Sequence, residues 1–258
     1  MKLAKCVLLA ALGLGSALMA GIASADELKE IRIATEGTYP PFSYLDKGKL
    51  TGFDVDIANA LCERMKIKCE IVAQEWDGMI PGLVAGKYDA IVASMNITEE
   101  RKKKIDFSNK YYATPARFIT VKDGGVSAIT PADLAGKSIG VQVSTTQSNY
   151  LEENYKDSDI KQYKTVDDAA MDLANGRIDT VFSDAALLYV WMKTKDGACC
   201  AFVGGDVVNE KYFGVGKGIG VRQGEVALRE QFNKAIAELR ADGTYEKINQ
   251  KYFPFSIY

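Results

Sequence analysis

One phrase occurs twice in the chain, and each copy describes the same piece of structure. The segment LVAGKYDAIVAS, from Leu83 to Ser94, lines up with LANGRIDTVFSD, from Leu173 to Asp184. In each copy a helical turn ends at a glycine, where a left-handed residue is needed, and an apolar strand follows. A single α/β connection could read this way by itself. Two copies predict two similar sheets, with Ser94 and Asp184 at the carboxyl ends of equivalent strands, where open α/β sheets bind ligands.

Strand and helix patterns alternate along the rest of the chain, which is typical of α/β proteins. The expected strands are 31–34, 70–73, 89–94, 138–143, a segment near 160, 178–183 and 218–222, and the expected helices are 54–65, 79–84, one from about 145, and 166–174. A last helix carries Phe232, Ala235, Ile236 and Leu239 on one face. The pattern predicts an α/β fold with two lobes, each a sheet flanked by helices.

The predicted lobes are built from three stretches of chain. We expect the tail to return to the first lobe, so that the chain crosses between lobes near 113–116 and again near 207–209. The first lobe then comprises residues 26–113 and 210–258, and the second comprises residues 114–209. Two crossings make a hinge about which the lobes can close on a ligand.

The first 25 residues predict a removed secretory signal. Lys2 and Lys5 precede an apolar stretch at 7–22, and Ala-Ser-Ala at 23–25 offers a cleavage site. A membrane anchor is the alternative, but it needs about 20 uninterrupted apolar residues. No later segment is long and apolar enough to span a bilayer, which disfavours the extracellular sensor of a receptor. We therefore expect a protein exported to the periplasm.

The absence of histidine from the sequence excludes several classes of enzyme. Without histidine there is no Ser-His-Asp or Cys-His nucleophile pair and no histidine-containing metal site. The formal net charge of −2 also offers a polyanion little attraction, so we expect no nucleic-acid partner. These features favour binding over catalysis, with no metal or other cofactor.

Four cysteines follow the predicted signal, and they allow three pairings. We favour a disulfide between Cys62, near the end of an expected helix, and Cys69, which enters the next strand, because this corner can bring them together. The adjacent Cys199 and Cys200 could form a strained bond or remain thiols. A zinc site is the alternative for all four, but the spacing lacks the usual pair of short knuckles.

Three features near the expected strand ends suit an amino-acid ligand. Arg101 can hold a carboxylate through two parallel hydrogen bonds, although it could also belong to a solvated helix face. The segment 143–147 leaves a strand and opens a helix, so its amides and the hydroxyls of Ser144 and Thr145 can bind an anion, or Ser144 or Thr145 can simply cap the helix. Asp184 can accept hydrogen bonds from an ammonium group, or can be a plain cap.

Three further residues could contact the ligand's side chain. Glu36 and Tyr39 follow the first expected strand, and Trp76 begins the second expected helix. Aromatic faces can sandwich an aliphatic stem or a guanidinium, and Glu36 would then pair with a distal positive charge. Core packing is the alternative for both aromatic residues.

Several motifs together resemble the polar amino-acid-binding proteins of bacterial ABC importers. They are TYPPF at 38–42, GFDVD at 52–56, ITEER at 97–101, YFG at 212–214 and ADGTYEK at 241–247. The similarity covers essentially the whole chain after the signal and is strongest to the lysine/arginine/ornithine, histidine and arginine binders. It implies a two-lobed periplasmic receptor of the type II binding-protein fold, which closes on its ligand and delivers it to a membrane permease. We expect the protein to be a monomer.

The resemblance also implies roles for individual residues. Arg101 with Thr146 would bind the α-carboxylate of the ligand, and Asp184 with Ser94 would bind its α-ammonium. Tyr39 and Trp76 would stack on the side chain, and Glu36 would bind its distal nitrogen. The predicted ligand-binding residues are Glu36, Tyr39, Trp76, Ala93, Ser94, Asn96, Arg101, Thr145, Thr146, Gln147 and Asp184.

Departures from the family pattern leave the ligand open. Cationic binders often carry Asp at the position of Glu36 and serines at the positions of Ala93 and Asn96. Opine-binding relatives carry a Glu-Gly segment like the one at 36–37, so an opine receptor is one alternative. A secreted dehydratase of the cyclohexadienyl type, which resembles the same fold, is another. The expected function is capture of arginine, lysine, ornithine or histidine.

Overall fold

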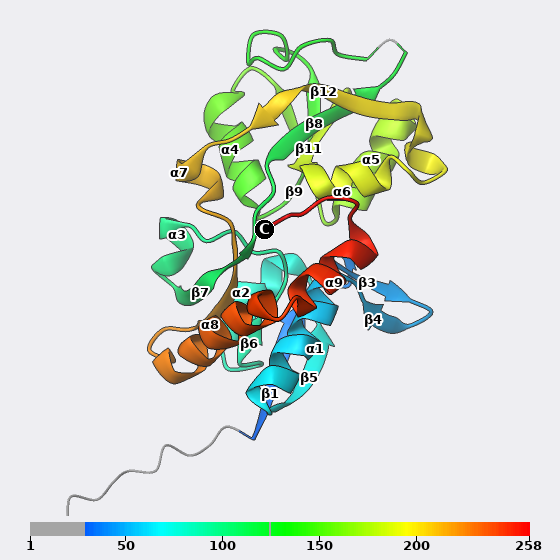
Figure 1. Ribbon diagram of the computed structural model, residues 1–258. Coiled ribbons are helices and arrows are strands. Elements are labelled where there is room, and N and C mark those ends of the chain that lie inside the picture. The colour runs from blue at the N-terminus through cyan, green and yellow to red at the C-terminus, as the bar shows by residue number, and fades with distance from the viewer. Residues whose placement is uncertain (1–28, 124) are drawn as a thin grey trace, which may run out of the picture.

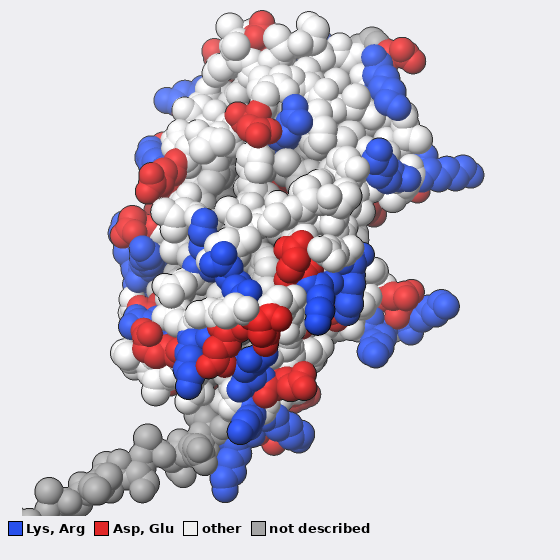
Figure 2. Space-filling view, viewed as in Figure 1, with Lys and Arg blue, Asp and Glu red and all other residues white. Residues whose placement is uncertain are grey.

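The structure is a computed structural model that describes residues 29–123 and 125–258, and the predicted signal at 1–25 lies outside these residues. Figure 1 shows two lobes, one above the other, with the C-terminus between them. Among the described residues, no helix has the length and apolar character needed to cross a membrane. On the face in Figure 2, basic and acidic side chains are intermixed, most densely over the lower lobe.

The first lobe is built on a five-stranded sheet whose order is β5-β1-β6-β13-β7. These strands are β1 (Glu30–Thr35), β5 (Lys68–Ala73), β6 (Ala90–Ile91), β7 (Ile105–Tyr112) and β13 (Lys217–Arg222). A small sheet of β2 (Thr38–Tyr39), β3 (Ser43–Asp46) and β4 (Lys49–Thr51) lies beside it, and the helical segments are α1 (Phe53–Met65), η1 (Trp76–Gly78), α2 (Met79–Val84), α3 (Glu99–Lys102), α8 (Val226–Ala241) and α9 (Thr244–Tyr252). The predicted apolar face of α8 is buried in the core of this lobe.

The second lobe repeats this architecture with the strand order β10-β9-β11-β8-β12. The strands are β8 (Ala116–Val121), β9 (Ser138–Gln142), β10 (Asp159–Tyr163), β11 (Thr180–Asp184) and β12 (Cys200–Val207). The helical segments are α4 (Thr146–Asn154), α5 (Val166–Ala174), α6 (Ala185–Trp191), η2 (Asp196–Cys199) and α7 (Glu210–Phe213). The predicted α/β fold of two sheet-containing lobes is therefore confirmed.

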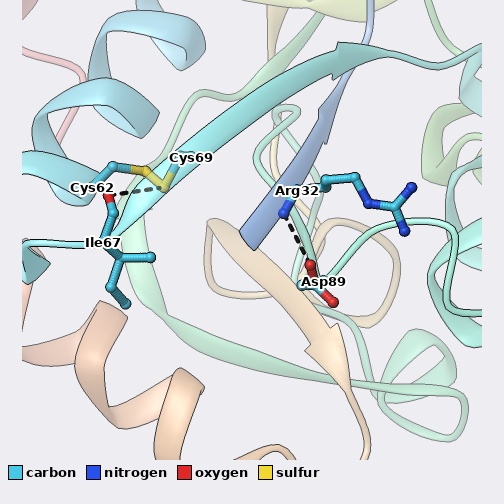
Figure 3. Close-up of a disulfide and its surroundings, with 5 residues drawn as sticks. All are labelled: Arg32, Cys62, Ile67, Cys69 and Asp89. Atoms are coloured by element: carbon cyan, nitrogen blue, oxygen red, sulfur yellow. Dashed lines mark hydrogen bonds between the residues drawn. A yellow bond between two sulfur atoms is a disulfide. The ribbon is translucent and has the colours of Figure 1, made fainter. Parts of the chain in front are cut away.

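The repeated phrase occupies equivalent places in the two sheets. Its strands, β6 and β11, each lie third in their sheet. The aspartate of each copy accepts a hydrogen bond from a backbone N–H of the neighbouring parallel strand. The N–H of Arg32 in β1 donates to Asp89 at 2.9 Å, and that of Ser138 in β9 donates to Asp179 at 2.8 Å. Figure 3 shows the first pair. One detail of the prediction was wrong, because the strand expected at 89–94 is only β6 and Ser94 follows it in a left-handed turn with φ 54°.

The fourth strand of each sheet, β13 in the first lobe and β8 in the second, directly follows a crossing of the chain from the other lobe. Strand β8 follows β7 and pairs antiparallel with β11, and β13 returns from the second lobe to pair antiparallel with β6 and β7. Helix α7 still packs on the second lobe, where the ring of Tyr212 meets that of Tyr150 at 5.2 Å and Phe213 meets Phe182 at 6.2 Å. We therefore propose that the return to the first lobe begins after Phe213 and not at residue 210.

The C-terminal segment lies against the first crossing. The N–H of Ala113 donates to the carbonyl of Ile257 at 2.8 Å. Buried Asn249 holds this segment at two points, because its amide donates to the carbonyl of Phe255 and accepts from the N–H of Ile257. The ring of Phe255 packs against Tyr189 of α6 at 5.7 Å, so the tail contacts both lobes beside the hinge.

The predicted disulfide is confirmed. Cys62 and Cys69 are bonded across the corner between α1 and β5, as Figure 3 shows. Helix α1 ends at left-handed Lys66, which turns the chain back into β5 and brings the two cysteines together. Cys199 and Cys200 are free thiols whose sulfur atoms lie 3.0 Å apart.

Candidate functional site

A narrow cavity lies between the lobes, where the carboxyl ends of the parallel strands of both sheets meet. It is lined by Glu36, Tyr39, Trp76, Ala93, Ser94, Asn96, Arg101, Gln142, Thr145, Thr146, Gln147, Asp184 and Lys217. All of the predicted ligand-binding residues belong to this lining, and their roles toward a ligand remain predictions. Gln142 and Lys217 were not among them.

Each lobe contributes one wall of the cavity from short segments that follow strands. In the first lobe, Glu36 follows β1, Trp76 begins η1 and the turn from Ala93 to Asn96 follows β6. In the second lobe, the wall is formed by the end of β9, the first turn of α4 and the last residue of β11. Loops held by rigid strands place such side chains accurately, and closure of the lobes brings the two walls together.

Arg101 is a buried cation that has no acidic partner in the part of the chain that the structure describes. Helix α3 begins at the N-cap Thr98, and burial lowers the pKa of Arg101 to about 10, which leaves it charged at neutral pH. Its guanidinium donates one hydrogen bond to the carbonyl of Asn96 at 3.2 Å and lies 5.2 Å from the ring centroid of Trp76. In the described part of the chain, no carboxylate lies within ion-pair distance of it. A buried charge needs a partner, so this geometry suits an incoming carboxylate.

The start of α4 lies across the cavity from Asn96. Thr145 is the N-cap, and its hydroxyl accepts from the N–H of Ser148 at 3.0 Å and donates to the carbonyl of Gln142 at 2.7 Å. The side-chain amide of Asn96 donates to the hydroxyl of Thr146 at 2.6 Å, which links the two lobes. The capping role and the anion-binding role predicted for this segment are compatible, because the first-turn amides stay directed along the helix axis.

Asp184 is the best-paired carboxylate of the cavity. The hydroxyl of Tyr39 donates to it at 2.8 Å and that of Thr114 at 3.2 Å. The ammonium of Lys217 lies 2.9 Å from both carboxylate oxygens, and the side chains of the two residues are 2% and 5% exposed. Tyr39 and Lys217 belong to the first lobe, so these contacts also hold the lobes together.

Glu36 is a buried carboxylate with an unusually high pKa. Burial raises the pKa to about 7, although hydrogen bonds from Gln142 and Thr38 lower it. The amide of Gln142 reaches Glu36 from the second lobe at 2.7 Å and also donates to the carbonyl of Lys164 at 3.1 Å. Glu36 is therefore poised to lose its proton when a cation arrives.

A fifth charged residue, Asp54, lies behind the cavity wall. It accepts hydrogen bonds from the hydroxyls of Ser94 and Tyr111, both at 2.8 Å, and burial raises its pKa to about 6. The Ser94 hydroxyl proton is therefore directed at Asp54, and its oxygen remains available as an acceptor.

The cavity and its surroundings hold every buried charged residue in the described part of the chain. These residues are Glu36, Asp54, Asp184, Arg101 and Lys217. With all of them ionised their charges sum to −1, so a ligand carrying one net positive charge leaves the closed site neutral. Within the described residues, no group of three or more Asp, Glu, Cys or His side chains is arranged to hold a metal ion.

A wider groove of about 640 Å³ adjoins the cavity and shares Trp76, Arg101 and Thr146 with it. It extends over α2, α3, α4 and α7, and its other charged residues include both signs. This groove continues the space between the lobes outward from the end of the cavity that Arg101 and Thr146 line.

Gln142 and Lys217 could have been noticed in the sequence, but their roles could not. Gln142 stands in an otherwise mostly apolar strand, and Lys217 stands between glycines at the start of a buried strand. A polar residue in such a strand is a weak signal of a buried contact, because its partner across the lobes is not visible in the sequence.

Comparisons with known proteins agree with the fold. The model for "Bacterial extracellular solute-binding proteins, family 3" matches residues 31–255. The L-arginine-binding protein of Pseudomonas aeruginosa is 46% identical, with 98% of each chain covered. The lysine/arginine/ornithine-binding periplasmic protein of Escherichia coli is 42% identical over 88% of this chain and 89% of its own. The structure of an ancestral arginine-binding protein bound to arginine is 38% identical, with a TM-score of 0.80 over 87% of this chain and 98% of that one. The predicted resemblance is confirmed, and the chain belongs to the bacterial extracellular solute-binding proteins of family 3.

Proposed function

We propose that this protein captures a cationic L-amino acid, namely arginine, lysine, ornithine or histidine, between its closing lobes. The observation that carries the proposal is the buried charge around the cavity, which sums to −1. An amino acid with an uncharged side chain would leave the buried carboxylate of Glu36 without a cation, and an unpaired buried carboxylate is costly. The distal charge of a cationic amino acid supplies that cation. The relatives named for arginine, lysine and ornithine support the same ligand class.

The proposed pose matches each ligand charge to a buried group. The α-carboxylate binds Arg101 and the first turn of α4 at Thr146, because Arg101 has no acidic partner in the described part of the protein. The α-ammonium lies near Asp184, with the Ser94 oxygen as a second acceptor. The distal cation pairs with Glu36.

The aromatic residues would line the stem of the ligand. Trp76 is half-buried, and its indole N–H donates to the carbonyl of Ser144 at 3.0 Å, so its ring spans the gap between the lobes. Tyr39 is buried, and its hydroxyl is held by Asp184. Both rings can contact a flexible aliphatic chain while leaving its charged end at Glu36.

We further propose that the protein works as a monomer in the periplasm and passes its ligand to an inner-membrane ABC permease, without covalent chemistry. The dehydratase alternative would use Glu36 or Asp184 as an acid or base. Incubation with prephenate or arogenate separates the two, since a binding protein leaves both unchanged and formation of a product would support the enzyme.

A thermal-shift screen over the common amino acids and opines tests the ligand class. A ligand that binds only the folded protein stabilises it by about 2.7 kcal/mol at a hundredfold excess over Kd, which raises Tm by roughly 5 to 10 °C for a chain of this size. We expect the largest shifts with arginine, lysine, ornithine or histidine. Shifts with acidic or neutral amino acids alone would contradict the proposal, and a shift confined to opines would favour the opine receptor.

The affinity for a cationic ligand is expected to fall as pH is lowered through 7. Free Glu36 has a pKa of about 7, and only its ionised form pairs with a cation, so binding below this pH releases a proton. The Kd should be nearly constant above about pH 8. Below pH 7 it should increase as pH falls, approaching a tenfold increase per pH unit. Calorimetry in two buffers of different ionisation enthalpy measures both the Kd and the proton release.

The groups around Glu36 define the pH range for this measurement. Asp54 raises the pKa of Glu36 and itself titrates near pH 6, while Arg101, with a pKa of about 10, stays charged. Asp184 and Lys217 are paired with each other across the cavity. Titrations between about pH 6.5 and about pH 8.5 therefore report mainly on Glu36. A Kd for arginine that is independent of pH in this range would show that Glu36 does not pair with the ligand.

A further inference from the structure

Lys217 places the Nζ of its side chain at the lining of the cavity, beside Asp184. It lies on β13, next to Asn96 in an isolated bridge, and its side chain is 2% exposed. The aliphatic stem crosses the buried wall of the first lobe, and the ammonium lies 2.9 Å from both oxygens of Asp184 in the second lobe. The ion pair therefore occupies the position where the α-ammonium of an amino acid would have to bind.

The acceptor capacity of Asp184 is already in use. A carboxylate offers about four lone-pair positions. Tyr39 and Thr114 each donate one hydrogen bond to Asp184, and Lys217 donates to both oxygens. An incoming ammonium must displace one of these donors or share the carboxylate with Lys217. Arg101 differs, because in the described part of the chain its only side-chain hydrogen bond is to a backbone carbonyl.

We propose that Lys217 is a specificity-determining residue that competes with the ligand's α-ammonium for Asp184. Binding then depends mainly on the α-carboxylate and the distal cation, and only weakly on the α-ammonium. The site accordingly takes ω-guanidino and ω-amino carboxylic acids that lack the α-amino group, in addition to the amino acids themselves. This inference rests on the proposed capture of a cationic amino acid.

The charges explain why the effect requires Lys217. When a deaminated ligand binds the wild-type protein, the net buried charge stays at −1, but Asp184 keeps its lysine partner and Glu36 still pairs with the distal cation, so neither of these carboxylates is left without a cation. Without Lys217 the buried charges would sum to −2, and only the α-ammonium of the ligand could pair with Asp184. An unpaired buried carboxylate is strongly unfavourable, so the preference for the α-ammonium should rise sharply.

The experiment compares the Kd of L-arginine with that of δ-guanidinovalerate, which is arginine without its α-amino group, by calorimetry on the wild-type protein and on Lys217→Met. L-lysine and ε-aminocaproate form a second pair of ligands. We expect the ratio of the two Kd values to be below about tenfold in the wild type and to exceed about a hundredfold in Lys217→Met. The ratio of the two Kd values is compared between the proteins, and not either Kd alone, because the substitution of Lys217 also alters closure of the lobes.

Two further variants complete the test. Lys234→Met removes a lysine of the same lobe whose side chain is 78% exposed, and its ratio should equal that of the wild type. Lys217→Gln keeps a hydrogen-bond donor near Asp184 without the charge. Lys217→Gln should also raise the ratio of Kd values, and it replaces Lys217→Met in the test if that variant does not fold.

The possible outcomes separate the inference from the proposed function. A wild-type ratio above about a hundredfold, or a ratio that Lys217→Met and Lys217→Gln leave unchanged, would overturn the role of Lys217 while arginine binding stands. If neither arginine nor lysine binds the wild-type protein, the proposed function fails and the inference fails with it.

Discussion

Replacing Arg101 with alanine is expected to weaken binding of the cationic amino acid by more than about 3 kcal/mol, which is over a hundredfold in Kd. Of the two buried cations at the cavity, Lys217 is paired with Asp184, and Arg101 has no oppositely charged partner within ion-pair distance among the described residues. In the variant, the α-carboxylate of the ligand would be buried with its charge unpaired. Calorimetry at about pH 8, where Glu36 is mostly ionised, measures the loss.

Two variants on the same helix control for charge and for geometry. Lys102→Ala removes a positive charge from a neighbouring residue whose side chain is 47% exposed and paired with Glu99, and its affinity should match the wild type. Arg101→Lys keeps the charge but lacks the planar fork that binds a carboxylate at two points, so its affinity should lie in between. Wild-type affinity in Arg101→Ala would remove Arg101 from the site.

Replacing Glu36 with glutamine is expected to weaken cationic ligands by about 3 kcal/mol while affecting neutral ones much less. The change takes the buried charge from −1 to 0, which a neutral zwitterion already satisfies. The cationic ligand would lose the partner of its distal charge. Binding of arginine and of glutamine, measured side by side on both proteins, gives the difference.

Glu36→Gln should also remove the pH dependence of arginine binding near pH 7, because the titrating group is gone. Glu75→Gln is a matched control, since Glu75 lies close by along the chain but its side chain is 76% exposed. It should leave both the affinity and the pH profile as in the wild type. Equal losses for arginine and glutamine in Glu36→Gln would mean that Glu36 does not read the charge of the ligand.

Much of the architecture could be predicted from local patterns. Helix α2 and helix α5 have the bounds expected from apolar spacing, and the expected left-handed residues are Gly86 and Gly176. The predicted equivalence of the two repeated strands is confirmed by the matching strand orders of the sheets. These features depend on nearby residues, so a single sequence contains the information for them.

Prediction was less accurate where packing between segments decides the structure. Strand β6 is shorter than the apolar run expected at 89–94. Only Ala90 and Ile91 pair with both β1 and β13 before the chain turns at Ser94. Helix α7 packs on the second lobe through Tyr212 and Phe213, a contact that apolar spacing along the chain does not reveal. Apolar residues of these kinds can pack in either lobe, and periodicity does not distinguish the two.

The alternation of the expected strands and helices, the glycine turns and the equivalence of β6 and β11 were determined by the sequence alone, because each depends on the backbone preferences and apolar spacing of a few neighbouring residues. The tertiary structure decided which partner, if any, each buried charged group has. It joins Lys217 to Asp184 and Gln142 to Glu36 across the lobes and leaves Arg101 without an acid among the described residues. Those pairings link segments far apart in the chain, and their strength depends on burial that exists only once the lobes have folded and met.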